Sequence, residues 1–334
     1  MSETEDTTKV QPDNPRMEEE PCSTKRGRKP KKGNWRVIQT VDITRICPFC
    51  NSPSIYKHGI RVNKQRYRCT SCCAVFTPTT NTVMAYSKKP TEIWKSVISD
   101  TLDSTPLADT AKQLDINEHT VFNMRHKIML AMARLEETDP TILREISELD
   151  ETYVLESQKG TKMEDGDRSA RKRGGKATKR GLSNEQVCIF AGVQREGAAY
   201  MKCVNHGKPS KSEIAEAFEG HTADDTMYMT DGLTGYSALE QMASCKVVNA
   251  KKVDSSFYHI NHVNNLHSQF KATYEAYRGV ATKYINRYLV LLAKTYKSKD
   301  DMIQVVWNAI CEMSATHYNF TAKDVTSYEL CDPS

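Results

Sequence analysis

Short apolar runs divide the second half of the chain into regular segments. Five runs have the length and β-branched content of strands, at residues 146–155, 187–193, 198–204, 226–230 and 246–249. Helical patterns at residues 211–219 and 236–243 lie between the later runs. Residues 259–297 repeat apolar positions every three or four residues, with a break at Arg278-Gly279. This order predicts an α/β or an α+β domain.

The first half of the chain follows other patterns. Residues 1–44 lack apolar periodicity and are rich in Glu, Thr, Pro, Lys and Arg, so we expect a disordered tail. Within it, residues 25–32 resemble an AT-hook, in which Arg26 and Arg28 would enter a narrow minor groove. A generic basic tail fits this segment equally well.

Two Cys-x2-Cys pairs predict a zinc site. Cys47 and Cys50 are separated from Cys69 and Cys72 by 18 residues, a spacing typical of four thiolates on two knuckle turns. Cys73 could replace Cys72, but the two-residue spacer favours Cys72. Four thiolates leave no open coordination position, so the expected Zn²⁺ is structural.

The segment between the cysteine pairs fits a β-hairpin, so we expect residues 45–80 to form a zinc ribbon. Basic residues of this hairpin, among them Arg66 and Arg68, are candidates for contacts with a nucleic-acid backbone. A ribbon that only stabilises the fold is the alternative.

A helix-turn-helix is the interpretation of residues 87–138, with turns near residues 104–106 and 115–117. Val121, Met124 and Ile128 would form the buried face of its last helix. The residues expected to face a major groove are His119, Thr120, Asn123, Arg125, His126 and Lys127. Two packed helices without a DNA role are the alternative.

Charge is distributed unevenly around a net value of +5. Residues 1–20 are acidic, whereas residues 25–36 and 159–180 are strongly basic and suit a polyanion. We expect a basic insertion at residues 158–182, in which Arg171, Lys172 and Arg173 would neutralise phosphates. A solvated insertion is the alternative reading of this segment.

Cysteine usage and hydropathy indicate a protein inside the cell. Of 11 cysteines, four have metal-ligand spacing, which favours a reducing compartment over a disulfide framework. The longest apolar run, residues 288–293, is far below the roughly 20 residues of a membrane-spanning helix. The acidic N-terminus lacks the apolar core of a signal peptide, so we expect no membrane partner.

Two aspartates are placed where strands carry metal ligands. Asp150 lies inside the run at residues 146–155, Asp231 follows the run at residues 226–230, and a polar segment follows at residues 261–271. Carboxylates on neighbouring strands can hold two magnesium ions. Each aspartate alone is more often a turn or cap residue, so the prediction depends on the combination.

Together these motifs resemble the DDE transposases of bacterial insertion sequences, in the zinc-ribbon group related to Merlin elements that has an ISXO2-like transposase domain. The resemblance covers residues 45–295 and implies an RNase H-like catalytic domain after the ribbon and the helix-turn-helix. The segments that carry it are the two cysteine pairs, Leu149-Asp150-Glu151-Thr152-Tyr153, Thr230-Asp231-Gly232, residues 259–268 and residues 278–284.

The resemblance implies that Asp150 and Asp231 hold catalytic Mg²⁺ or Mn²⁺. Alignment on Lys271 puts Asn264 at the third position, where most relatives have glutamate and some have asparagine. An asparagine offers a neutral oxygen, so the second metal would be held less tightly. Water, a phosphate, His262 or His267 would complete the shell; helix-cap or DNA-backbone contacts are the alternative for these histidines.

The implied function is metal-dependent cleavage at the element's terminal inverted repeats and strand transfer into target DNA. Lys271 would position DNA, and His267, Arg278 and Lys283 are further candidate contacts. A homodimer or larger synaptic complex on double-stranded DNA, in the nucleoid or a nucleus, is expected. The alternatives are a non-catalytic DNA-binding regulator derived from a transposase and a nuclease without strand transfer.

We therefore expect five segments. They are a tail at residues 1–44, a zinc ribbon at 45–80, a helix-turn-helix at 87–138, a catalytic domain at 144–297 and a C-terminal helix and tail at 298–334.

Overall fold

The computed structural model describes residues 46–61, 64–160, 175–195, 197–242, 245–252, 256–296, 299–311 and 325–326. The expected tail at residues 1–44, with Arg26 and Arg28, lies outside the described residues. The same is true of residues 161–174, which include Arg171, Lys172 and Arg173.

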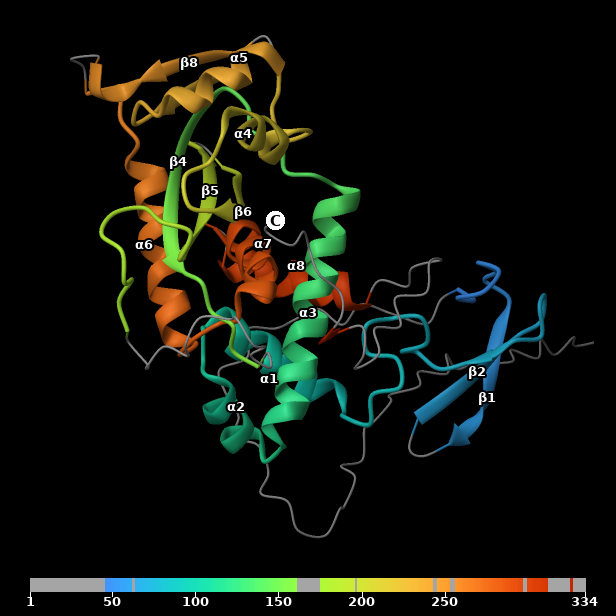
Figure 1. The fold of residues 1–334 in the computed structure, drawn as a ribbon. Helices are drawn as coiled ribbons and strands as arrows, with labels where there is room; N and C mark the ends of the chain where they lie inside the picture. Colours follow the sequence, from blue (N-terminus) through green and yellow to red (C-terminus); the bar gives the residue numbers. More distant parts are fainter. Residues whose placement is uncertain are drawn as a thin grey trace, which may run out of the picture. The chain divides into compact units, whose positions relative to one another are not determined.

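The larger sheet has five strands in the order β6-β5-β4-β7-β8 (Figure 1). Strands β4 (Ile146–Leu155), β5 (Gln186–Gln194) and β6 (Ala199–His206) form an antiparallel meander. Strands β7 (Met227–Thr230) and β8 (Lys246–Asn249) extend the sheet in parallel on the other side of β4. This mixed sheet with β4 at its centre has RNase H-like strand order, which confirms the predicted α/β class.

Helices cover both faces of this sheet. Helices α6 (Asn261–Ala276) and α7 (Ile285–Thr295) pack on one face, where Val263, Leu266 and Leu289 join a core with β5 and β6. Helix α4 (Lys211–Phe218), the 3-10 turn η1 (Thr234–Ala238) and α5 (Leu239–Met242) belong to the core of the other face. Strand β5 is therefore buried on both faces, which explains its continuous apolar sequence.

Three helices precede the sheet, as predicted for residues 87–138. They are α1 (Thr91–Leu102), α2 (Leu107–Leu114) and α3 (Glu118–Thr138). Asp115, with a left-handed φ of 53°, ends α2, and the Asn117 side chain accepts a hydrogen bond from the His119 N–H at the start of α3. Val121, Met124 and Ile128 are buried as expected. Helix α8 (Lys299–Cys311) packs into the same core as α1 and α3.

The cysteine-rich segment forms a small antiparallel sheet of β1 (Ile55–Arg61), β2 (Lys64–Cys69) and β3 (Val75–Phe76). Tyr67 stacks on Phe76 beside Cys47 and Cys69, which gives this sheet its own core. The β1-β2 pair is the hairpin predicted between the cysteine pairs. Within the described ranges, no helix combines the length and apolar composition needed to cross a membrane.

The packing around β5 yields a stability prediction. A Cβ added to Gly192 would lie 2.4 Å from Leu143 Cδ1 and 3.0 Å from Leu149 Cδ2, both in the closed core of one sheet face. We expect Gly192→Ala to lower the free energy of unfolding by about 1–3 kcal/mol, measured by denaturant titration with circular dichroism. Gly197→Ala is the control, because its Cβ would meet nothing within 4 Å. Equal stability of the two variants would contradict this packing.

Candidate functional site

The four predicted cysteine ligands come together in the small sheet. Suitable ligand atoms of Cys47, Cys50, Cys69 and Cys72 all lie within 4.8 Å of one another. The Sγ atoms of Cys47 and Cys72 are 3.6 Å apart, as are those of Cys50 and Cys69. Four sulfurs around one Zn²⁺ in tetrahedral geometry would be about 3.8 Å apart, so this donor set fits a zinc ribbon.

Backbone conformation separates Cys73 from the ligands. Asn51 and Cys73 each follow the second cysteine of a pair, and both are left-handed, with φ of 55° and 59°. Each knuckle turn thus ends on a residue that reverses the chain. Cys73 is exposed and outside the four-cysteine group, in agreement with the preference for Cys72.

The carboxylates of Asp150, Glu151 and Asp231 form a second group, with one oxygen from each within 4.8 Å of the others. Because β4 and β7 are parallel neighbours, Asp150 on β4 and Asp231 just after β7 reach the same end of the sheet. The expected pair is therefore brought together. Glu151 was not predicted as a ligand. The signal available in the sequence was that this carboxylate directly follows Asp150.

Crowding of these carboxylates changes their acidity. Burial, together with the charges of Glu151 and Asp231, raises the pKa of Asp150 to about 7. Burial and the Asp231 charge also raise the pKa of Glu151 above its ordinary value. Ionising the whole group is unfavourable without a neighbouring cation. Lys251 Nζ lies 3.3 Å from Asp231 Oδ2, but this lysine is largely exposed.

Oxygen donors of this kind fit Mg²⁺ or Mn²⁺, which both prefer carboxylates. Three half-buried carboxyl groups offer the charge and the hard donors that such a cation requires. The donor set therefore fits the divalent metal that the resemblance implies.

Helix α6 brings His267 to the carboxylates. Its Nδ1 lies 3.6 Å from Asp150 Oδ2, and its side chain is buried, with Nε2 lacking a hydrogen-bond partner among the described residues. Burial, with the charge of Lys271, lowers the pKa of His267 to about 4, so the ring is neutral at pH 7. With 6% exposure, His267 lies inside the site beside Asp150, and its expected contact with DNA stays a prediction.

Asn264 and Lys271 are exposed on the same helix. Asn264 lies one turn before His267 and Lys271 one turn after it, so the three share one side of α6. No hydrogen bond joins the Asn264 side chain to Asp150 or Asp231 among the described residues. Asn264 therefore lies on the side of α6 that carries His267, which is the side near the carboxylates.

A buried glutamate that the sequence analysis missed fixes α6 against the sheet. Glu148, two residues before Asp150 on β4, accepts hydrogen bonds from the His262 N–H at 2.7 Å and from the Val263 N–H at 3.3 Å. Arg195 Nε donates to it at 2.9 Å. Burial would raise the pKa of Glu148, but the bonds from His262 and Arg195 lower it overall.

His259 and His262 lie near Glu148 and could with it form a metal site by residue type. The Arg195 guanidinium occupies the same place, since its NH2 nitrogen lies 3.4 Å from His259 Nδ1 and donates to the His259 carbonyl. A permanent cation among these side chains opposes metal binding. This cluster is therefore an ion-paired helix cap, which agrees with the cap alternative for His262.

Two of the residues expected in a major groove are buried. Arg125 is fully buried, and its guanidinium donates to the Thr101 hydroxyl and the Thr105 carbonyl. His126 has 1% exposure and lies 2.9 Å from an Arg287 nitrogen. Both predictions are wrong, because the middle of α3 is enclosed by other helices. His119 is exposed, and Thr120, Asn123 and Lys127 are half-buried.

The other basic candidates lie on the described surface. Arg278 is exposed and left-handed, with φ of 56°, and Lys283 Nζ lies 5.2 Å from the Tyr284 ring centroid. This segment is tied to the chain after β4, since Thr282 N–H donates to the Ser157 carbonyl and Ser157 N–H to the Thr282 hydroxyl. Arg278 and Lys283, the candidate DNA contacts of this segment, therefore belong to a stretch that is hydrogen-bonded to the chain just before the basic insertion.

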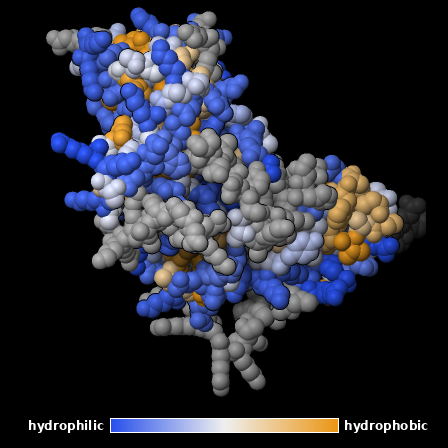
Figure 2. Space-filling view, in the orientation of Figure 1, coloured by the Kyte–Doolittle hydropathy of each residue, from blue (hydrophilic) through white to orange (hydrophobic). Residues whose placement is uncertain are grey.

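Arg66 and Arg68 lie on β2 and are half-buried. The exposed large apolar side chains of the ribbon segment are Ile46, Phe49, Tyr56, Ile60 and Val75. In the view of Figure 2, hydrophobic residues gather over the ribbon, whereas hydrophilic residues dominate the rest of the coloured surface.

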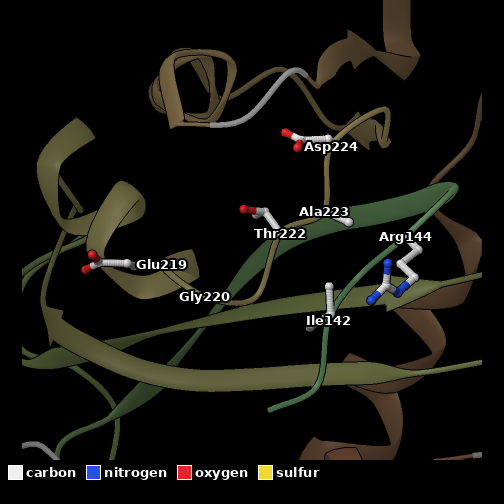
Figure 3. Close-up of a pocket in the computed structure, with 7 residues that line it drawn as sticks. All are labelled: Ile142, Arg144, Glu219, Gly220, Thr222, Ala223 and Asp224. Carbon is white, nitrogen blue, oxygen red and sulfur yellow. The ribbon is translucent and has the colours of Figure 1, made fainter.

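A hollow in the surface lies away from the carboxylates. Figure 3 shows it between Ile142 and Arg144, just before β4, and the loop from Glu219 to Asp224 that leads from α4 to β7. These residues precede β4 and β7, whereas Asp150 and Asp231 lie further along or after those strands. The hollow therefore has no part in the carboxylate site.

Comparison with solved structures finds transposase complexes. A pre-cleavage Mos1 transpososome has 11% identity, with 74% of this chain and 82% of that chain covered and a TM-score of 0.25. A mariner Mos1 paired end complex with Mg has 12% identity, coverage of 72% and 80%, and a TM-score of 0.28. A Mos1 strand transfer complex has 10% identity, coverage of 68% and 77%, and a TM-score of 0.28.

Comparison with curated protein sequences gave no match. A family model does match: residues 142–293 fit the ISXO2-like transposase domain. This range begins just before β4 and ends within α7, so it contains the five-stranded sheet, helices α4, α5 and α6 and all three carboxylates. Over residues 142–293 the chain therefore carries an ISXO2-like transposase domain of the DDE class of insertion sequences.

Proposed function

We propose that this protein is a DNA transposase that binds the terminal inverted repeats of its element, cuts there and joins the freed end to target DNA. The observation that carries the proposal is the group of Asp150, Glu151 and Asp231 at the end of β4 and β7, inside the matched transposase domain. Metal-assisted phosphoryl transfer depends on divalent ions, and carboxylates are the usual protein ligands of such ions.

Asp150 and Asp231 would hold Mg²⁺ or Mn²⁺, with Asn264 oriented toward the second position. When bound, the metal activates the attacking water or hydroxyl and stabilises the leaving oxygen. Lys251 beside Asp231 would offset part of the negative charge before metal and DNA arrive. Lys271, exposed one turn after His267, would contact a phosphate near the scissile bond.

The chain would first hydrolyse a phosphodiester at the element's end, so that a 3′-hydroxyl is freed. That hydroxyl would then attack a target phosphodiester, with the target 3′-oxygen as leaving group. Paired ends require at least two active sites, so a homodimer or larger synaptic complex is the proposed working form.

Outside the catalytic site, DNA would bind to those predicted contact residues whose side chains are exposed or half-buried. The start of α3 offers His119 and Thr120, with Asn123 and Lys127 half-buried further along. N-terminal residues of a recognition helix are those that contact base edges. Arg278 and Lys283, and Arg66 and Arg68 on the ribbon, are proposed to contact phosphates.

The proposed division keeps five parts: the tail, a Zn²⁺-bound ribbon, a helix-turn-helix, a catalytic domain with a basic insertion, and the C-terminal segment. Zn²⁺ in the ribbon would be structural, because four thiolates fill its coordination sphere. The protein would act where chromosomal DNA is.

Cleavage assays test the proposed catalytic site. We expect the purified protein with Mn²⁺ to nick and join DNA that carries the terminal repeats, and Asp231→Asn to lower the rate by about 10²-fold or more, since a charge-stabilising group is lost. Binding of the same DNA, measured by fluorescence anisotropy, should stay intact.

Asp225→Asn is the matched control, because Asp225 is exposed before β7 and its φ of 60° suits asparagine. Cleavage and joining by Asp231→Asn at the wild-type rate would contradict the assignment of the site. DNA that is bound by the wild type but never cut would favour the regulator, and cut but never joined product would favour the nuclease.

Zinc content tests the ribbon. We expect Cys72→Ser to lose the metal and unfold the segment around β1 and β2, because metal binding and folding are coupled in small zinc modules. Cys73→Ser should keep one Zn²⁺ per chain, since Cys73 is outside the four-cysteine group. Mass spectrometry for zinc and circular dichroism report the two effects. Loss of zinc in Cys73→Ser with retention in Cys72→Ser would reverse the assignment.

A further inference from the structure

We infer that the sheet of β1, β2 and β3 binds single-stranded DNA on its outer face, where an unpaired base stacks on Tyr56. This binding activity goes beyond the cutting and joining of terminal-repeat DNA. It rests on the proposed function in one respect, because the choice of DNA over RNA follows from the transposase domain at residues 142–293.

Strand register divides the side chains of this sheet between two faces. Directly opposed residues point to the same face, and neighbours along a strand point to opposite faces. Tyr67 is the partner of Phe76 and joins the core beside Cys47 and Cys69, so these residues mark the inner face. Arg68, the neighbour of Tyr67, therefore points to the outer face.

A row of side chains that includes an aromatic ring crosses the outer face. Arg68 is the Cα partner of both Tyr56 on β1 and Val75 on β3, so the three side chains lie side by side. Tyr56 is 46% exposed and Val75 is 43% exposed. The His58 ring meets the Tyr56 ring edge to face, with 6.2 Å between centroids. The middle of this face thus offers solvent an apolar surface that contains a flat ring.

Positive side chains flank this row. Arg66 and Lys64 follow Arg68 at two-residue steps on β2, and Arg61 is the partner of Lys64, so all four belong to the outer face. Residues 46–80 contain five Lys or Arg and no Asp or Glu. The cysteine thiolates lie toward the inner face. The outer face therefore has the charge that suits a polyanion.

The apolar row favours a single strand over a duplex. Duplex DNA presents charged phosphates outward and keeps the flat faces of its bases inside the stack, so it offers Tyr56 and Val75 no apolar surface to bury. Three strands are also wider than the two-stranded ribbon that fits a major groove. An unpaired base exposes its flat face and can stack on an aromatic side chain, while flanking arginines contact the phosphates.

Binding of an oligothymidylate tests the inference. Fluorescence anisotropy with a labelled strand of about 12 nucleotides gives the dissociation constant of the full-length, zinc-loaded protein. We expect Tyr56→Ala to weaken binding about fivefold or more, since one base loses its stacking partner. Tyr56→Phe should stay within about twofold of wild type, because the ring is kept. Tyr86→Asn is the matched control, since Tyr86 is 89% exposed outside the strands and its φ of 57° suits asparagine.

A duplex of the same length separates base stacking from backbone contacts. Tyr56→Ala should change duplex affinity by less than about twofold, because paired bases are not available for stacking. Equal losses on strand and duplex overturn the assignment, as does wild-type affinity of Tyr56→Ala for the strand. Sedimentation velocity covers the third outcome: a change of oligomeric state in Tyr56→Ala with unchanged strand affinity would make this face a protein contact and also overturn it.

The salt dependence of strand binding gives a second, independent measurement. We expect Arg68→Gln to lower the slope of log K against log salt concentration by about 0.7, since one phosphate contact is lost. Lys208→Gln is the control, because Lys208 is exposed after β6 and outside the ribbon. An unchanged slope in Arg68→Gln contradicts the assignment of the outer face.

Zinc content and circular dichroism equal to wild type guard against a folding defect in these variants. Failure of the proposed function is distinct from failure of this inference. In the first case the protein would bind the strand through Tyr56 and yet leave terminal-repeat DNA uncut. In the second case it would cut and join that DNA, while its affinity for the strand would not depend on Tyr56.

Discussion

Mutual repulsion among Asp150, Glu151 and Asp231 opposes the folding of the sheet end at which they meet. The structure offsets part of it with two contacts: the Tyr236 hydroxyl on Glu151 and Lys251 beside Asp231. The pKa values of Asp150 and Glu151 stay raised, so these contacts offset only part of the repulsion. A divalent cation would offset more of it and, in phosphoryl transfer, would also meet the substrate's phosphate.

Strand β4 connects the site to the rest of the domain. Its first half pairs with two strands, and Glu148 in that half holds the first N–H groups of α6, so the helix is fixed by the same strand that carries Asp150. Asp150 follows Glu148 by two residues on β4, so both side chains point to the same face of the sheet. Helix α6 therefore presents His267 at a set distance from Asp150. The geometry of the site depends on a buried carboxylate that takes no part in the chemistry.

Much of this fold was accessible from the sequence. Every strand of the large sheet overlaps the apolar run that predicts it, because period and length are local properties. The cysteine spacing and the order of Asp150 and Asp231 predicted two groups of side chains that the structure brings together. Glu148 was missed because its partner His262 is 114 positions away. Arg125 was predicted to face DNA because charged side chains are normally exposed. Its hydrogen-bond partners inside the protein, the Thr101 hydroxyl and the Thr105 carbonyl, come together only in the folded structure.

We propose that the carboxylates at the end of β4 and β7 bind a divalent metal that acts on DNA. Anomalous diffraction from crystals of the protein with terminal-repeat DNA and Mn²⁺ tests it most directly. We expect Mn²⁺ bound to Asp150 and Asp231, with a DNA phosphate oxygen in its coordination sphere. DNA held elsewhere on the protein, with no Mn²⁺ at these aspartates although the crystals contain saturating metal, would contradict it.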